Sequence, residues 1–457
     1  MTHRGDARTS SRIPRRTVAG YAIGSLGTGG FGTLPGLVLV YYLTDNLGVT
    51  ALVAGLIVSL AKLWDVVIDP VIGSLSDRSL ARSGSRRGLM LLGALTLPVF
   101  FALTFAVPVD VGPTTAAIWV LVSFTLTATS FSLFQVPYIA LPAELTDRYD
   151  ERTRLLTWRV VVLTVAILLF GAGGPLLRGL GDTPAQGYLL MAVVAGLVIA
   201  AGLTPAAATA PRRSPAAAPA RVPVSVHYRL AARALRESQP FRALLGTFVL
   251  QGLATGTMLA GAQYVATHVL RSEDAVTLLF LALIAPAVLV TPVWGAVARR
   301  IGKERGYVIA SVLYAIAALA ITGIIWQPGA WVYAPVALAG IAYAGMQALP
   351  LAMLPDVIAH DAGARGTDRA GVFSGVWTAG ETAGMALGAT ALTLVLAATG
   401  YVESVGGQTV AQPDSAIIGI VVAFSLVPAA LLIASILVLR RYRLRRADID
   451  VLAEAVR

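Results

Sequence analysis

The chain has 457 residues, of which 56% are hydrophobic and 13% are charged, and its mean hydropathy is +0.76. This composition excludes a single water-soluble domain, because one soluble core cannot bury so much apolar surface. The net charge of +11 comes from basic residues in short loops beside apolar runs, so we expect membrane lipid and no nucleic acid as a partner.

Apolar runs of roughly twenty residues, the length that crosses a bilayer as a helix, recur along the whole chain. The sequence lacks the alternating ten-residue strands of a membrane barrel, so helices must satisfy the backbone in lipid. The predicted fold class is an all-α membrane protein with twelve transmembrane helices. The predicted spans are 18–43, 51–76, 89–108, 115–143, 155–177, 188–208, 241–269, 276–298, 307–327, 332–356, 370–398 and 416–439.

The loops between these spans differ in their content of Lys and Arg. An even number of spans puts both termini on one side, and 31 of the 35 basic residues lie in the tails and loops of that side. The opposite loops hold only Arg178 and Arg271. Because basic loops stay inside the cell, we predict a multi-pass inner (plasma) membrane protein with both termini cytoplasmic.

The segment 209–240 interrupts the membrane pattern with four prolines among alanines, followed by a basic stretch of helical spacing. This composition predicts a cytoplasmic linker with an interfacial helix. Six spans lie on each side of it. The predicted organisation is a tail 1–17, a bundle 18–208, the linker 209–240, a second bundle 241–439 and a tail 440–457.

Two motifs recur at equivalent places in the two halves. Gly73 to Arg78 resembles Gly295 to Arg300, and Pro137 to Glu144 resembles Pro350 to Asp356. Such a parallel repeat predicts the major facilitator fold, in which two six-helix bundles rock about a central site. We expect close helix contact at the glycine and ion pairs that break during rocking, or else a loop that only sets topology. The expected coupling and gating residues here are Gly73, Asp77, Arg78, Glu144 and Asp356.

The second predicted span contains Lys62, Asp65 and Asp69, followed by Pro70. Spacings of three and four residues put the three charged side chains on one helical face. Each charge at mid-membrane costs about 2.5–3.5 kcal/mol, so this face must point inward or to water. Two carboxylates, with the backbone carbonyl that a proline leaves without its donor, predict a hard-oxygen site for sodium or a proton.

Two other interpretations of this cluster stay open. Lys62 could neutralise one Asp in a purely structural ion cluster. A membrane prenyltransferase-like enzyme, which would hold magnesium diphosphate on acidic motifs, is a remote alternative because a second acidic cluster is missing from the sequence. We predict no catalytic residue and no cofactor, only a coupling ion held by Asp65 and Asp69.

Polar residues in other spans are further candidates. Ser132 and Gln135 in the fourth span can hydrogen-bond an ion or a solute. Arg159 in the fifth span either snorkels or holds a solute with its fork of donors. Glu381, in the eleventh span, is a candidate proton carrier or a partner for Arg159 or Lys62.

Several residues of the eleventh span, and both histidines near span ends, have a plainer interpretation. Small residues at this spacing let helices meet closely. We expect His268 and His360 at the surface. The glycines expected to pack are Gly371, Gly375, Gly380, Gly384 and Gly388.

The segment Ala61 to Gly73 resembles the glycoside–pentoside–hexuronide:cation symporters, as do Tyr21 to Gly27 and Tyr41 to Gly48. This resemblance implies that Asp65 and Asp69 bind sodium, lithium or a proton. It also implies that Ser132 supplies a hydroxyl ligand and that Arg159 lies beside the solute.

Other residues depart from melibiose permease, a member of that family. Gly29 and Gln135 stand where that protein has sugar-binding aspartates, and Glu381 with Thr382 stands near the place of a lysine. The resemblance therefore implies a retained cation site and a changed solute site. The expected solute-binding residues are Gln135, Arg159, Gly29, Trp64 and Gln347.

These observations together predict a monomeric secondary active transporter, a cation:solute symporter for a glycoside-like or related small organic solute. A sodium-coupled carrier of lysophospholipids or other amphiphiles, and a proton-coupled exporter, are the alternatives. In each case the two bundles would expose the central site to either side in turn.

Overall fold

A computed structural model provides the structure of the chain. Within the part it describes, twelve helices are long and apolar enough to cross a membrane, which confirms the predicted number. The outer parts of the predicted tails and the proline-rich part of the linker, with Arg4 and Arg8, lie outside that part. The described residues are 12–108, 110–146, 148–212, 224–272, 274–365, 370–408 and 410–444.

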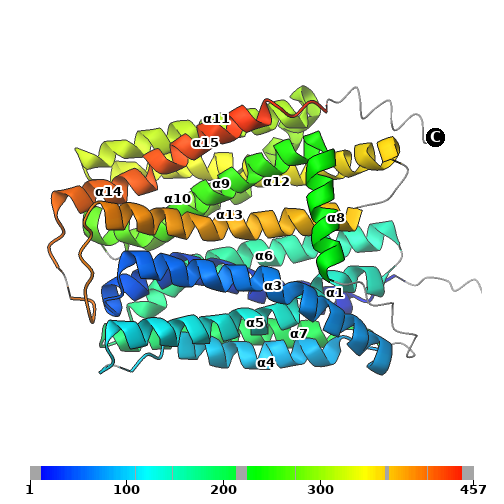
Figure 1. The fold of residues 1–457 in the computed structure, drawn as a ribbon, viewed down its shortest axis with the longest axis horizontal. Coiled ribbons are helices and arrows are strands. Elements are labelled where there is room, and N and C mark those ends of the chain that lie inside the picture. Colours follow the sequence, from blue (N-terminus) through cyan, green and yellow to red (C-terminus); the bar gives the residue numbers. More distant parts are fainter. Residues whose placement is uncertain are drawn as a thin grey trace, which may run out of the picture.

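The helices form two bundles that lie side by side with their axes roughly parallel (Figure 1). The first span consists of α1 and α2, and it ends in a π-helical turn, η1 (Tyr42–Asn46). The helices of the first bundle are α1 (Arg15–Ile23), α2 (Ser25–Tyr41), α3 (Ala51–Ser83), α4 (Arg87–Thr104), α5 (Pro113–Leu145), α6 (Tyr149–Arg178) and α7 (Pro184–Ala208).

The second bundle repeats this arrangement. Its first span again ends in a π-helical turn, η2 (Val265–Val269), and its last span is broken at Ser425. The helices are α9 (Gln239–Tyr264), α10 (Ala275–Ile301), α11 (Lys303–Ile321), α12 (Tyr333–Arg365), α13 (Ala370–Ala398), α14 (Asp414–Phe424) and α15 (Leu426–Leu439).

The linker contains one described helix, α8 (Val224–Glu237), which crosses one end of the molecule almost at right angles to the bundles (Figure 1). It packs on α9 and α13 through Ala234 and Leu235, while Arg229 and Leu230 are exposed. The basic stretch thus forms a helix, and its place at a membrane interface stays a prediction.

Several helices are longer than the predicted spans, most strongly at the end of the molecule where α1 begins. The second span is expected to end at residue 76, but α3 continues to Ser83, and α6 begins at Tyr149 instead of residue 155. A helix that leaves the hydrocarbon keeps its internal hydrogen bonds, so the boundary of the apolar run does not end it.

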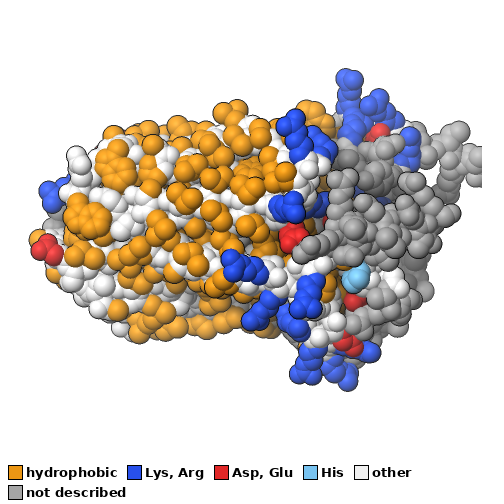
Figure 2. Space-filling model, turned by 90° about the horizontal axis from the view of Figure 1, so that it is seen from above, with side chains coloured by type: hydrophobic (Ala, Val, Ile, Leu, Met, Phe, Trp, Pro, Cys, Tyr) orange, Lys and Arg blue, Asp and Glu red, His pale blue; other side chains and the backbone are white. Residues whose placement is uncertain are grey.

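The two ends of the molecule differ in charge. We call the end where α1 begins and α15 ends the terminal end, and the end with η1, η2 and residues 399–408 the loop end. Figure 2 shows an apolar band over most of the length, with Lys and Arg side chains gathered toward the terminal end. The exposed surface thus has the pattern of a protein with one basic face at the membrane boundary.

Contacts between the bundles follow the internal repeat. The second span of each bundle packs on the fifth span of the other, so α3 lies against α13 and α10 against α6, while α2 lies against α9. Hydrogen bonds between the bundles, among the described residues, all lie toward the loop end, for example from Thr277 to the carbonyl of Ala172. The bundles are therefore joined tightly at the loop end.

Candidate functional site

Asp65 lies near the middle of α3, about 21 Å along the helix from its first residue. Its side chain is buried, with 9% of the residue exposed, and its Oδ2 atom is 3.3 Å from Nζ of Lys62. Lys62 also lies over the ring of Phe31 from α2, 5.3 Å from the ring centre. Asp65 and Lys62 therefore form an ion pair on one face of α3, as their spacing of three residues predicts.

The two acids of α3 have carboxylate oxygens without a hydrogen-bond partner. Oδ1 of Asp65 and Oδ1 of Asp69 are both buried and unpaired. Ser132, on the neighbouring helix α5, lies near the Asp69 carboxylate. A buried oxygen without a partner costs about 1–3 kcal/mol or more when charged, so these oxygens favour a bound cation or proton.

The acids do not belong to a larger cluster of metal-binding side chains. Among the described residues, no three or more His, Asp or Glu side chains come together to hold a metal ion. A cation at Asp65 and Asp69 would take its remaining oxygen ligands from hydroxyls such as Ser132, from backbone carbonyls or from water.

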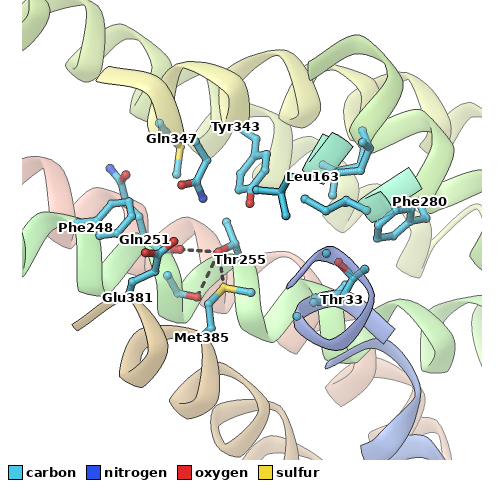
Figure 3. Close-up of a pocket in the computed structure, with 18 of the residues that line it drawn as sticks. Thr33, Leu163, Phe248, Gln251, Thr255, Phe280, Tyr343, Gln347, Glu381 and Met385 are labelled. Atoms are coloured by element: carbon cyan, nitrogen blue, oxygen red, sulfur yellow. Dashed lines mark hydrogen bonds between the residues drawn. The ribbon is translucent and has the colours of Figure 1, made fainter. Parts of the chain in front are cut away.

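A central cavity of about 250 Å³ lies between the two bundles (Figure 3). The second bundle supplies most of its walls, and Figure 3 shows Tyr343 and Gln347 of α12 pointing toward Thr255 and Met385. Its lining residues are Thr28, Gly29, Gly32, Thr33, Leu163, Ile167, Phe248, Gln251, Gly252, Thr255, Leu259, Phe280, Leu283, Ile284, Tyr314, Tyr343, Met346, Gln347, Glu381 and Met385.

The cavity combines apolar and aromatic walls with a few polar groups. Gln347 brings an amide, Thr28 and Thr255 bring hydroxyls, and Glu381 is the only charged side chain of the lining. The amide of Gln251 is already bonded to Ser311, Ser435 and Tyr307. Sites of this kind bind a small organic molecule, because the apolar walls remove water and the polar groups fix its orientation.

The expected solute-binding residues occupy different places. Gly29 and Gln347 line the cavity, whereas Gln135 lies behind it and accepts a hydrogen bond of 2.9 Å from Thr28. Trp64 is outside the lining, and its indole donates to Thr129 of α5 at 2.9 Å. Arg159 is also outside the lining, with its guanidinium 5.2 Å from the ring centre of Tyr138.

The polar groups around Arg159 belong to the first bundle. The Tyr138 hydroxyl donates to the carbonyl of Tyr21 at 2.8 Å and lies 3.1 Å from the hydroxyl of Ser25. Glu381 forms no ion pair with Arg159 or Lys62, because no described Lys or Arg nitrogen lies within 4.0 Å of its carboxylate. The structure does not contain the pairing considered for Glu381.

At the terminal end, Arg86 is the centre of an ion-pair cluster. Its guanidinium is 2.7 Å from Asp77 and 2.5 Å from Glu144, and it also donates to Ser76. Burial alone would lower the pKa of Arg86, but the hydrogen bonds and charges of Glu144 and Asp77 outweigh burial and raise this pKa. The arginine therefore stays charged and holds α3, α4 and α5 together.

The sequence motif predicts that Arg78 forms the ion pairs at this end, but in the structure Arg86 forms them. Gly84, with φ of 69°, ends α3 in a left-handed turn and brings Arg86 back toward α3. No ion pair of Arg78 occurs among the described residues, and a Cβ atom at Gly73 would meet only Val136, at 3.8 Å. Close helix packing therefore does not require a glycine at position 73. The glycine with a structural role here is Gly84, which ends α3.

The second bundle has the equivalent ion pair. Nζ of Lys303, at the start of α11, lies 2.6 Å from Oδ2 of Asp356 near the end of α12, and it also donates to the carbonyl of Ala352. Arg86 and Glu144 occupy the same places on α4 and α5. The repeat that the two motifs predict thus extends to the ion pairs of the terminal end.

A second polar cluster seals the loop end. Asp45, which is 4% exposed, accepts a 2.6 Å hydrogen bond from Tyr401 and lies 3.5 Å from the ring of His268. The hydroxyls of Thr44 and Tyr264, from the two bundles, are 2.6 Å apart. Burial, and then the neighbouring charge of Asp45, raise the pKa of Tyr401, so its hydroxyl stays a donor.

The sequence does not predict this cluster, although Thr44 and Asp45 belong to the motif Tyr41 to Gly48. The expectation that His268 lies at the surface is wrong, because only 12% of its side chain is exposed. The sequence does contain a signal for this cluster, which is an acid, Asp45, at the end of the first span and a histidine, His268, at the end of the seventh. Nothing in the local sequence shows that those two ends meet across the bundles.

Comparison with known proteins agrees with this arrangement. A family model described as MFS/sugar transport protein, where MFS is the major facilitator superfamily, matches residues 20–446. An uncharacterized symporter of Synechocystis sp. is 25% identical, over 96% of both chains. A glucuronide carrier protein homolog of Escherichia coli is 23% identical, over 95% of this chain and 94% of that one.

A solved structure of a D-xylose-proton symporter has the same fold, with a TM-score of 0.70 at 12% identity, over 95% of this chain and 99% of that one. The match of the family model over nearly the whole chain also rules out the prenyltransferase-like enzyme. The chain belongs to the MFS/sugar transport protein family, and it is a transporter of the type of the glycoside–pentoside–hexuronide:cation symporters.

Proposed function

We propose that the protein is a symporter that couples a cation on Asp65 and Asp69 to the transport of a small, glycoside-like solute. The observation that carries this proposal is the pair of buried Oδ1 atoms without hydrogen-bond partners at mid-membrane. Two carboxylates beside one ammonium, that of Lys62, leave a net negative charge, and a bound cation neutralises it. The Ser132 hydroxyl is the proposed third ligand.

The nature of the solute is inferred from the cavity and from the relatives. The cavity volume of about 250 Å³ is just below the range of about 300–1,000 Å³ that is usual for sites of drug-sized ligands. This size favours a compact solute over an amphiphile with a long acyl chain. The name of one relative, a glucuronide carrier protein homolog, favours a sugar derivative, and the name of another, an uncharacterized symporter, favours coupled transport.

The proposed orientation puts the terminal end, with both termini, in the cytoplasm. Its support is the gathering of Lys and Arg at that end (Figure 2). With the loop end sealed around Asp45, the described state is then inward-facing. The two bundles of one chain together enclose the cavity, and we propose a monomer as the transporting unit.

The proposed coupling passes through α3. This helix carries both acids, and it packs on α13 of the other bundle, which carries Glu381. A cation on Asp65 and Asp69 removes the uncompensated charge that would otherwise oppose movement of α3 through the membrane. The membrane potential then contributes about 2.3 kcal/mol per charge at 100 mV to accumulation of the solute.

Ion-dependent thermal stability of the purified protein tests this proposal. Sodium or lithium should raise the melting temperature of the wild type, because a ligand that binds only the folded state stabilises it by about 2.7 kcal/mol at one hundred times its Kd. Potassium and choline should have no effect. The variant Asp69→Asn should lose the response, and the control Asp182→Asn, an exposed loop-end acid, should keep it.

A wild type that responds to no metal ion, but whose stability and solute uptake follow pH through Asp69, would replace sodium by a proton as the coupling ion. That result would also favour the proton-coupled exporter. Coupled uptake in vesicles that survives both Asp65→Asn and Asp69→Asn would reject the cation site altogether.

A further inference from the structure

Glu381 is a carboxylate without a cationic partner in the central cavity. It lines the cavity from the middle of α13, and its side chain is exposed to that space. No described lysine or arginine lies within 4.0 Å of it. None of the other lining residues carries a charge.

The two basic residues nearest in the membrane already have partners of their own. Lys62 is held by Asp65 at 3.3 Å and by the ring of Phe31. Arg159 lies against Tyr138 within the first bundle. Neither contributes to the lining, so the negative charge of the cavity has no counterpart within the described protein.

A charge in a site of low dielectric is costly unless it is paired, and transporters keep such residues for function. Such a carboxylate is balanced either by a proton or by a cation, and a cationic solute in the cavity supplies that cation. An anionic solute would add a second negative charge at close range and would be repelled. A solute with a positive charge would be attracted by the same carboxylate.

The rest of the lining suits a compact cation that also carries hydroxyl groups. Phe248, whose ring is stacked on Trp377 at 4.3 Å, and Tyr343 offer aromatic faces, which attract cations. Gln347 offers an amide that can accept and donate hydrogen bonds to hydroxyls, whereas the amide of Gln251 is already bonded to Ser311, Ser435 and Tyr307. Phe248 lies on α9, Tyr343 and Gln347 lie on α12, and Glu381 lies on α13, so these groups surround the solute on the side of the second bundle.

We propose that the transported solute carries a protonated amine, and that Glu381 binds this amine: the substrate class is an amino-substituted glycoside or a similarly compact polyhydroxylated amine. This inference rests on the proposed function of the cavity as the solute site. Glu381 is then the residue that selects for charge, in addition to the cation site on α3.

Binding of matched glycosides tests this inference. The probes are sets of mono- and disaccharide methyl glycosides, each as a neutral sugar, its amino-substituted form and its uronic acid, at a pH at which the amine is protonated. Binding is measured by calorimetry and by ligand-induced thermal shift. The wild type should bind at least one amino member about tenfold more tightly than its neutral partner, or about 1.4 kcal/mol, and should bind the acid most weakly.

Three variants test whether Glu381 causes the preference for the amine. Glu381→Gln should reduce the preference for the amine to about onefold, and Glu381→Lys should reverse it in favour of the uronic acid. The control Thr382→Val changes the next residue of α13, which is outside the lining, and should keep the preference.

The inference is overturned by a wild type that prefers neutral or acidic members, by an unchanged preference in Glu381→Gln, or by the failure of every amino member to bind at millimolar concentration. The sodium response of Asp69 distinguishes this failure from that of the proposed function. A response that persists without amine preference rejects only the amine, and amine binding without any ion response rejects only the cation coupling.

Discussion

At the scale of single residues, the arginine at the terminal end shows how position decides the role of a charge. Arg86 and Arg78 lie eight residues apart in the same basic segment, yet only Arg86 forms ion pairs among the described residues. The difference comes from the turn at Gly84, which returns the chain toward Glu144. The side chain of Glu144, which is 10% exposed, pairs with this arginine.

We expect Arg86→Gln to lower the free energy of unfolding by about 1.5–3 kcal/mol, because its hydrogen bonds to the charged groups of Asp77 and Glu144 are lost. Arg78→Gln should change it by less than about 0.5 kcal/mol. Chemical unfolding in detergent measures both. Equal effects of the two substitutions would mean that Arg86 contributes only its charge to the surface.

At the scale of helices, contact between α9 and α13 depends on glycines near the loop end. A Cβ atom at Gly388 would lie 2.5 Å from the backbone nitrogen of Thr257, and one at Gly256 would lie 2.4 Å from the carbonyl oxygen of Met385. Gly371 and Gly375, toward the terminal end of α13, have nothing within 4 Å of a Cβ atom. The prediction that all five glycines of α13 pack closely is therefore wrong for these two.

Alanine substitutions distinguish the two groups. Gly388→Ala should destabilise the protein by about 1–3 kcal/mol, because the added methyl group meets backbone atoms that cannot move aside. Gly375→Ala should be neutral or should stabilise the helix by up to about 1 kcal/mol, because alanine is the better helix former. Melting temperatures of the two variants provide the comparison, and a stable Gly388→Ala protein would show that α9 and α13 separate easily.

At the scale of the whole molecule, the bundles meet at the loop end through Asp45, Tyr401 and their neighbours. No hydrogen bond of this kind joins the bundles at the terminal end within the described residues. Alternating access requires that the loop-end cluster break when the terminal end closes. On the proposed mechanism, the described state is one of the two end states of rocking.

This asymmetry predicts the side from which the cavity is reached. The chain contains no cysteine, so all labelling by a thiol reagent comes from a single introduced cysteine. Gly32, in the cavity lining, and Gly112, at the loop end, both have room for a side chain. A membrane-impermeant maleimide should label Gly32→Cys only in inside-out vesicles and the control Gly112→Cys only in right-side-out vesicles. Labelling of both from one side would reverse the proposed orientation or the state of the cavity.

The sequence alone determined the fold and the place of the proposed cation site. Spans, repeats and helical faces are local or periodic properties, so the number of helices and the shared face of Lys62, Asp65 and Asp69 follow from spacing. The lengths of the helices beyond the hydrocarbon did not follow, because a helix continues in water wherever its own hydrogen bonds persist.

Only the tertiary structure decided which distant residues meet. Gln251, Thr255 and Tyr343 read as ordinary polar residues in apolar spans, and it is the packing of one bundle against the other that brings them to the same cavity as Glu381. In the same way, Asp45 meets His268 and Tyr401 across the bundles. Contacts between residues hundreds of positions apart depend on how the bundles rest on each other, and no local pattern of side chains encodes that arrangement.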